Sequence, residues 1–195
     1  MTARFFRDVV WSAIGVGGAF GAIRVMESFR PEVIADDVGA PGNTTSVGEL
    51  TRAYFLSASV MAGSPVATTA RLPAVSGPLG IAVQVAGVGL RVRAMRALGG
   101  HYSRGLRVAE GQPVVTSGPY RYVRHPGYLA AVLAWLGAAL STRNAVPVAI
   151  TLLAVGTAYR HRIDAEEALL VNDLPGYAEY AATTGRLVPL LSSRR

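Results

Sequence analysis

The chain has 195 residues, of which 51% are hydrophobic and only 16% are charged. A soluble domain carries about 25% charged residues, so this composition excludes an ordinary water-soluble globule and indicates a membrane protein. All 19 basic residues are arginine, and with 12 acidic residues they give a net charge of +7. No soluble stretch combines basic and aromatic residues in a stripe, which argues against nucleic-acid binding. The absence of cysteine excludes disulfides and thiolate ligands, and the three histidines lack metal-ligand spacing, so no metal is expected.

Five apolar segments approach the roughly 20 residues that a helix needs to cross a bilayer core. They lie at residues 9–26, 51–70, 78–97, 126–141 and 145–160. A short polar turn joins the last two segments, which predicts a helical hairpin. Residues 27–50 are rich in proline, glycine and acids and predict a loop. The basic start of the first segment, with Arg4 and Arg7, is also compatible with a signal peptide.

The arginines predict the orientation in the membrane. Twelve of the 19 lie at the inner end of the third segment, between the third and fourth segments, or after the fifth. Cytoplasmic loops retain arginine, so residues 98–125 and the C-terminus are expected in the cytoplasm. Five crossings then place the N-terminus outside, whereas Arg4 and Arg7 favour the opposite side. Either the segment at 9–26 or that at 51–70 is not a full crossing, or the many C-terminal arginines dominate. We follow the arginine-rich C-terminal half.

Two polar clusters flank the predicted hairpin. Residues 117–128 read SGPYRYVRHPGY, where Pro126 suits the first turn of a helix. Residues 160–170 read RHRIDAEEALL. A hairpin returns the chain to the side it left, so the two clusters face each other at the cytoplasmic mouth. Arginines, carboxylates and aromatic rings are therefore expected around one pocket.

This set of side chains matches the groups of S-adenosylmethionine. An arginine can hold its carboxylate with a bidentate pair, and a glutamate suits its ammonium and ribose hydroxyls. Aromatic faces attract its sulfonium by about 0.5 to 2 kcal/mol. The same residues also fit a plainer interpretation, with arginines on phospholipid head groups, an interfacial tyrosine belt and solvated glutamates. The residues alone leave both interpretations open.

Several motifs in order resemble the isoprenylcysteine carboxyl methyltransferase and phospholipid methyltransferase family. They are ALGGHYSR at 97–104, GPYRYVRHPGY at 118–128, R-x-x-x-EE-x-LL at 162–170 and GRLVP at 185–189. The resemblance covers about residues 80–190. It implies an all-α integral-membrane bundle of about five transmembrane helices with a cytosolic C-terminal helical cap. Residues 1–75 would then hold N-terminal transmembrane helices and a polar loop, and 76–195 the methyltransferase core with its cytosolic cofactor pocket.

Matched position by position, the resemblance implies a cofactor site for S-adenosylmethionine. Its residues are Tyr120, Arg124, His125, Tyr128, Glu166, Glu167 and Leu170. Arg162, Arg186 and Glu167 are the candidates for steering an anionic group or for catalysis. Pro175 interrupts the segment after the double glutamate, which leaves the roles of Tyr177 and Tyr180 open.

The resemblance implies methyl transfer to a lipophilic or prenylated acceptor at the cytosolic face of a membrane. The use of arginine as the sole basic residue is a sign of high-GC coding and predicts that this membrane is a bacterial inner membrane. A carboxylate acceptor, which would give a methyl ester, needs no base, whereas an amine or thiol would need His125 or a glutamate. The expected partners are a small lipophilic substrate and membrane lipids. Two alternatives remain: a nicotinamide-dependent sterol or enone reductase, whose usual HPNY reads HPGY here, and a non-enzymatic membrane scaffold.

Small residues line the third and fourth segments, among them Gly87 and Ala134. They could leave a side opening through which an acceptor reaches the site from the bilayer. They could equally serve to pack the two helices closely, as small residues in membranes usually do. Both interpretations stay open from the sequence.

Overall fold

The computed structural model describes residues 2–29, 43–67, 70–102, 108 and 111–189. Its five long helices are α1 (Thr2–Ser28), α2 (Asn43–Ala67), α3 (Ser76–Leu98), α4 (Pro126–Ser141) and α5 (Ala145–Asp173). A short helix, α6 (Tyr177–Thr183), and two 3-10 turns, η1 (Gly99–His101) and η2 (Gly118–Arg121), complete the described elements. Apart from two isolated bridges, the described residues form no β-structure. The prediction of an all-α fold is confirmed.

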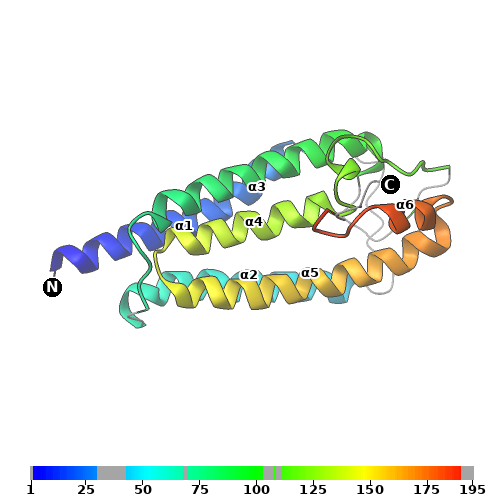
Figure 1. Cartoon of the computed structure of the whole chain (residues 1–195). Coiled ribbons are helices and arrows are strands. Elements are labelled where there is room, and N and C mark those ends of the chain that lie inside the picture. The colour runs from blue at the N-terminus through cyan, green and yellow to red at the C-terminus, as the bar shows by residue number, and fades with distance from the viewer. Residues whose placement is uncertain (1, 30–42, 68–69, 103–107, 109–110, 190–195) are drawn as a thin grey trace.

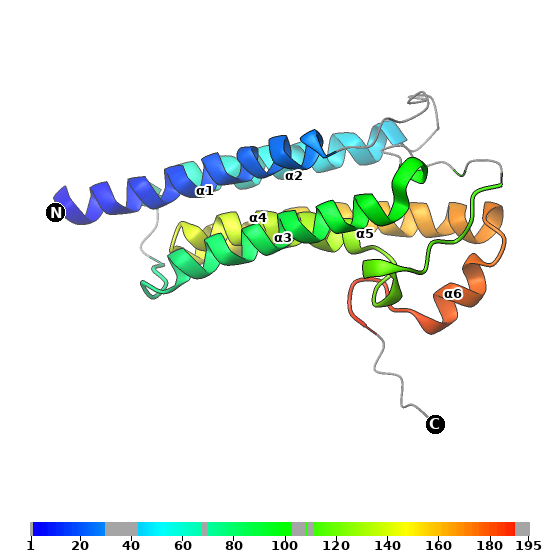
Figure 2. The same cartoon turned by 90° about the horizontal axis from the view of Figure 1, so that it is seen from above.

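The long helices form an elongated bundle in which successive helices alternate in direction (Figures 1 and 2). The N-terminus lies at one end. The start of α4, the 3-10 turns and α6 gather at the other end, which we call the site end. Five alternating helices therefore place the N-terminus opposite the site end, the relation that five crossings require.

Helix α1 shows an inverted pattern that suits lipid rather than water. Its buried positions repeat at three- and four-residue intervals and carry small or polar side chains: Asp8, Ser12, Gly15, Ala19 and Ala22. Its large apolar side chains point outward instead, including Phe5, Phe6, Ile14, Phe20 and Val25. In a bilayer the outward apolar face is solvated by lipid tails, and small inward residues let helices approach closely.

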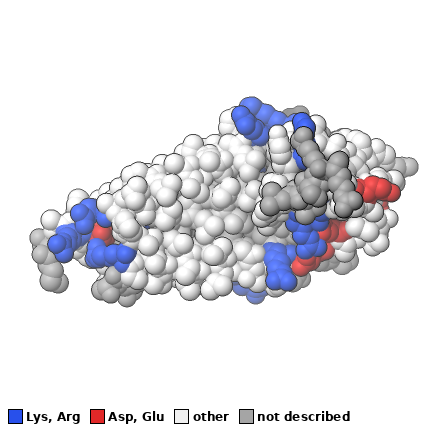
Figure 3. All heavy atoms as spheres, viewed as in Figure 1, with Lys and Arg blue, Asp and Glu red and all other residues white. Residues whose placement is uncertain are grey.

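The distribution of charged side chains also suits a membrane protein. In Figure 3 the charged side chains of the visible face gather towards the two ends, and the surface between them is uncharged. Among the described helices, Ala3–Ser28 is long and apolar enough by composition to cross a membrane, and Pro126–Ser141 is apolar but shorter. At the end that holds the N-terminus, Asp8 pairs with Arg71 and ties α1 to the chain before α3.

The tightest helix contact joins α3 and α4 through glycine. A Cβ added to Gly87 would lie 2.7 Å from the Ala130 carbonyl oxygen and 2.8 Å from the Ala134 nitrogen. A Cβ on Gly137 would lie 2.6 Å from the Gly80 carbonyl oxygen. The backbones of the two helices touch at these glycines, which supports the packing interpretation of the small residues here.

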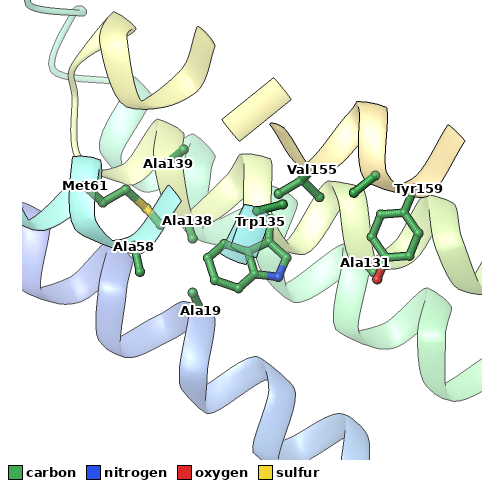
Figure 4. Packing of buried hydrophobic residues seen from close by; sticks show 11 residues of the cluster. Ala19, Ala58, Met61, Ala131, Trp135, Ala138, Ala139, Val155 and Tyr159 are labelled. Carbon is green, nitrogen blue, oxygen red and sulfur yellow. The ribbon is translucent and has the colours of Figure 1, made fainter. Parts of the chain in front are cut away.

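The core of the bundle is rich in alanine. It contains Ala19, Ala53, Ala58, Met61, Ala131, Trp135, Ala138, Ala139, Val155, Ala158 and Tyr159 (Figure 4). Alanine allows close approach of four helices, and the few large side chains then fill the remaining space. Trp135 lies in the middle of this cluster and stacks on Tyr54, with ring centroids 4.6 Å apart.

Helix boundaries agree with most expectations and correct two. The hairpin of α4 and α5 turns at residues 142–144, as expected, with the Asn144 side chain accepting a hydrogen bond from the Val146 backbone N–H at 3.0 Å. The loop predicted over 27–50 is too long, because α2 already begins at Asn43. Helix α5 continues to Asp173, well past 160, since its last turns pack against the polar site end rather than lipid.

Helix lengths also differ within the hairpin. At 1.5 Å per residue, the 16 residues of α4 span about 24 Å and the 29 residues of α5 about 43 Å. Because the hairpin aligns the two helices at their turn, α5 extends beyond the start of α4. Loops and α6 occupy the difference at the site end.

Candidate active site

A cavity of about 850 Å³, including its open mouth, lies at the site end. Helices α3, α4, α5 and α6 and the segment before α4 supply its walls. The lining residues are Arg91, Leu98, His101, Tyr102, Gln112, Pro113, Val114, Val115, Tyr120, Arg124, His125, Gly127, Tyr128, Glu166, Leu170, Leu174, Tyr177 and Tyr180. We call this space the polar pocket, because ionic and phenolic groups from four helices converge on it.

The segment before α4 is held by the chain that follows α6. The Arg124 and His125 backbone N–H groups donate to the carbonyl oxygens of Gly185 and Arg186 at 2.8 and 3.1 Å. His125 precedes the helix, and Pro126 occupies its first position, where the missing N–H has no cost. The GRLVP motif thus fixes the backbone of the RHP motif at the pocket wall.

Glu167 is the hub of the ionic network beside the pocket. Its Oε1 accepts hydrogen bonds from Arg124 Nε at 2.9 Å and lies 2.9 Å from His125 Nε2. Its Oε2 lies 2.7 Å from Arg186 Nη2. Burial raises the pKa of the Glu167 carboxyl, but the hydrogen bonds and charges of His125 and Arg124 outweigh burial and lower that pKa to about 2. Glu167 is therefore ionised, fully engaged and a poor base.

Arg124 is equally engaged. Its Nη1 donates to the carbonyl oxygen of Ala181 at 2.7 Å and to that of Thr184, and its Nη2 lies 2.8 Å from Glu167 Oε1. These bonds tie α5 to the end of α6. Arg186, which is half exposed, also donates to Asp164 Oδ1 at 2.7 Å.

Two buried polar atoms of the pocket lack hydrogen bonds from the described residues. They are Glu166 Oε2 and the Tyr177 hydroxyl. Glu166 Oε2 lies 3.8 Å from His125 Nδ1, beyond hydrogen-bond distance. Burial raises the pKa of Tyr177, so its phenol keeps its proton and can donate. A buried polar atom without a partner costs about 1 to 3 kcal/mol, and a ligand with complementary polar groups would remove this cost.

Aromatic rings form another part of the pocket wall. His125 stacks on Tyr128, with ring centroids 5.6 Å apart, and Tyr128 contacts Tyr159 at 5.2 Å. The Tyr180 hydroxyl donates to the Tyr120 carbonyl oxygen at 2.6 Å, and burial raises the pKa of Tyr180 to about 12. The pocket therefore combines neutral phenols with ionised groups.

The residues proposed from sequence divide into two groups. Tyr120, Arg124, His125, Tyr128, Glu166 and Leu170 line the polar pocket, as do Tyr177 and Tyr180. Glu167, Arg162 and Arg186 are outside the lining. Arg162 is buried behind Tyr128, whose hydroxyl accepts from Arg162 Nε at 3.1 Å. Part of the ALGGHYSR motif, including Arg104, lies outside the described residues.

Sequence reasoning missed Arg91. Its Nη2 donates to the Tyr102 hydroxyl at 2.7 Å, and its guanidinium carbon lies 5.4 Å from the Tyr102 ring centroid. No acidic side chain among the described residues lies within ion-pair distance of it. The sequence carries a signal for its direction: Gly80, Gly87 and Arg91 share one face of α3, at spacings of seven and four residues.

Arg91 and Tyr102 also line a second cavity, of about 660 Å³ including its opening. Ten of its other lining residues are apolar or aromatic: Ala19, Ala22, Ile23, Met26, Tyr54, Met95, Ala131, Ala134, Trp135 and Tyr159; Glu27 is the remaining one. We call this space the apolar cavity. It lies among the five long helices, and Arg91 stands where it adjoins the polar pocket.

The described residues contain no cluster of acidic, histidine or cysteine side chains suited to a metal ion.

Comparisons with known proteins agree with this architecture. Residues 80–172 match the isoprenylcysteine carboxyl methyltransferase (ICMT) family model. The cobalt-zinc-cadmium resistance protein CzcN of Cupriavidus metallidurans is 38% identical over 82 residues, which cover 42% of this chain and 38% of that protein. The nickel-cobalt-cadmium resistance protein NccN of Alcaligenes xylosoxydans xylosoxydans is 34% identical over 79 residues, which cover 40% and 37%. The matches thus span less than half of these relatives.

The fold is similar to the solved structure of the eukaryotic intramembrane Ras methyltransferase ICMT. The TM-score is 0.57 and the sequence identity 21%, over 75% of this chain and 50% of the other. The helical integral-membrane architecture expected from the sequence is thereby confirmed. Residues 80–172 are therefore similar to the isoprenylcysteine carboxyl methyltransferase family, and the helical fold is similar to that of the solved ICMT structure.

Proposed function

We propose that this protein transfers a methyl group from S-adenosylmethionine to the carboxylate of a lipophilic acceptor at the cytosolic face of a bacterial inner membrane. One observation carries the proposal. Arg91, a cation without an acidic partner among the described residues, stands where the polar pocket adjoins the apolar cavity. An ionic cofactor and an apolar acceptor can thus meet at one guanidinium.

The polar pocket fits the cofactor on chemistry. Glu166 Oε2 can accept from an ammonium or a ribose hydroxyl, and the Tyr177 hydroxyl can donate to an acceptor atom. Tyr120, Tyr128 and Tyr180 line the same space, and aromatic rings attract a sulfonium through their faces. A cofactor would therefore satisfy polar atoms that are otherwise buried without hydrogen bonds.

The acceptor would occupy the apolar cavity with its carboxylate at Arg91. A guanidinium binds a carboxylate through two parallel hydrogen bonds and so fixes its orientation. When bound, the cofactor supplies a methyl group whose bond to sulfur breaks as its bond to the carboxylate oxygen forms, which leaves a thioether and a methyl ester without net proton transfer. No base is needed, and alignment in a dry site supplies about 7 to 11 kcal/mol of barrier reduction.

For the ionic network behind the wall we propose positioning roles. Both oxygens of Glu167 are engaged, so this residue orders Arg124, His125 and Arg186 rather than moving a proton. Arg162 holds the Tyr128 hydroxyl in place. In this proposal Arg91 binds the acceptor carboxylate, and Arg162, Arg186 and Glu167 position the groups around the site.

The proposal is tested by methyl transfer and by cofactor affinity. Detergent-solubilised protein should transfer radiolabelled methyl groups to apolar carboxylic acids, and mild base should release the label as methanol, which identifies an ester. Calorimetry with S-adenosylhomocysteine should show an affinity loss of about 10- to 150-fold in Glu166→Gln, the range for a hydrogen bond to a charged group. The matched control is Glu179→Gln, an exposed glutamate on α6. Cofactor affinity equal to wild type in Glu166→Gln would overturn the site assignment.

A second pair of variants tests the Tyr177 hydroxyl. Tyr177→Phe removes only the buried hydroxyl and should weaken S-adenosylhomocysteine by about 2- to 12-fold. Tyr122→Phe makes the same change at an exposed position and should have no effect. Equal affinities in the two variants would show that the Tyr177 hydroxyl does not contact the cofactor.

A further inference from the structure

We propose that Trp135 sets the maximum length of the acceptor by closing the far end of the apolar cavity. The inference rests on the proposed function and adds a substrate class to it: carboxylic acids with an extended apolar tail of about eight to ten carbons. Such an acceptor is shorter than a farnesylated cysteine.

The position of Trp135 supports this role. Its side chain is 3% exposed and lines the apolar cavity. Beyond it along α4, Ala138 and Ala139 are fully buried in the core cluster and do not line the cavity. Tyr54 stacks on one indole face, and the Phe20 ring meets the indole edge-on at 6.5 Å. Figure 4 shows the indole between these alanines and Tyr159. The ring therefore separates the open cavity from the packed core.

The depth of the cavity follows from two helices. A Cβ on Gly127 would lie 2.5 Å from Arg91 Nη1, so the guanidinium is level with Gly127 on α4. Trp135 comes eight residues later, a rise of about 12 Å. The lining residues of α1, Ala19 to Glu27, span the same eight residues and the same ~12 Å. Helical side chains lean towards the N-terminus, so the indole leans towards Arg91 and shortens the usable depth to about 10 Å.

This depth limits the tail. A carbon chain with bonds of about 1.52 Å and angles near 111° advances about 1.25 Å per bond. About 10 Å then holds roughly eight bonds beyond the carboxylate. A farnesylcysteine places more than about fifteen bonds beyond its carboxylate and needs about 19 Å when extended. The cavity between Arg91 and Trp135 is too short for it.

The test compares methyl transfer to saturated straight-chain acids of about six to sixteen carbons. Each methylene that enters the cavity should raise kcat/KM about fourfold, and the wild type should reach its maximum near eight to ten carbons. Trp135→Leu should move this maximum about two carbons longer. Trp11→Leu is the matched control, because Trp11 packs against Gly77 in the other half of the bundle and lines neither cavity. S-adenosylhomocysteine affinity should be unchanged in both.

Further variants keep the inference falsifiable if Trp135→Leu does not fold. Trp135→Phe makes a smaller change and should lengthen the preferred acid by about one carbon. Ala22→Leu adds bulk midway along the apolar cavity and should shorten the preferred acid. The proposal would be overturned if the folded Trp135 variants kept the wild-type length maximum. It would also be overturned if the wild type methylated farnesylcysteine as well as an acid of about ten carbons.

Fluorescence separates this inference from the proposed function. Trp11→Phe leaves Trp135 as the single tryptophan of the chain. A terminally brominated acid of about ten carbons should quench Trp135, and one of about four carbons should not. If the wild type methylates no acid, the proposed acceptor chemistry fails, and the quenching alone decides the role of Trp135. Equal quenching by both acids, or none, would refute it.

Discussion

Replacing Arg91 tests the central step of the proposed reaction. Arg91→Gln removes the charge and, because glutamine is shorter than arginine, also the hydrogen bond from Nη2 to the Tyr102 hydroxyl, which is 2.7 Å long. The variant should lose acceptor turnover and keep cofactor affinity, because the cofactor groups of the pocket lie on Glu166 and Tyr177. Arg91 thus separates acceptor binding from cofactor binding.

The size of the loss follows from the charges involved. Hydrogen bonds to a charged group contribute about 1.5 to 3 kcal/mol, or roughly 10- to 150-fold in kcat/KM. The acceptor carboxylate would also lose the cation that pairs with it at the edge of an apolar cavity, which adds a desolvation cost. We therefore expect a loss of about 10²- to 10³-fold in Arg91→Gln. Arg91→Lys should be intermediate, since an ammonium cannot form the bidentate pair.

Helix α3 also supplies a matched control for the Arg91 variants. Arg93→Gln removes the same charge two residues along α3, on an exposed face, and should leave both parameters unchanged. Initial rates of methyl ester formation give kcat and KM, and calorimetry gives the affinity for S-adenosylhomocysteine. A parallel loss of cofactor affinity and turnover in Arg91→Gln would show that Arg91 holds the cofactor instead. Unchanged turnover would refute its role altogether.

Three further predictions follow from the fold and the ionic network. The pKa of Glu167 is lowered to about 2, so the stabilisation from its ionised carboxylate is complete above the unfolded pKa of about 4.5. The melting temperature in detergent should therefore fall as the pH drops from about 4.5 towards 2. Glu167→Gln should abolish this part of the pH dependence. Gly87→Ala should destabilise the bundle by about 1 to 3 kcal/mol through backbone clashes, whereas Gly89→Ala, which meets open space, should be tolerated; equal melting temperatures would contradict the close packing. In this cysteine-free chain, a cysteine at Ser117 should react only from the cytosolic side and one at Ala74 only from outside; the reverse pattern would invert the proposed orientation.

The long helices and the site end could be predicted because their signals are local. Apolar runs give the helices, and a polar turn followed by a second apolar run gives the hairpin that brings Glu166 opposite His125. The position of Glu167 was predictable, but its partners were not. Its bond to Arg186 depends on the chain after α6 returning to pair with the RHP segment. No local pattern encodes that return.

Arg91 was missed for a different physical reason. It precedes Arg93 and Arg96 in a basic run that is typical of a solvated helix end. Which arginine points inward depends on the rotation of α3, and that rotation is set by the glycine contacts with α4. The direction of one side chain is thus a consequence of helix packing, which composition and hydropathy do not report.

The shortness of α4 connects the fold to the proposed chemistry. If α4 were as long as α5, its first turns would fill the site end, and no polar pocket could form above Arg91. Because α4 starts late, His125 and Tyr128 border the polar pocket, and the apolar cavity adjoins this pocket at Arg91. An ionic cofactor can then arrive from water and an apolar acid from lipid, and neither has to cross the phase that excludes it.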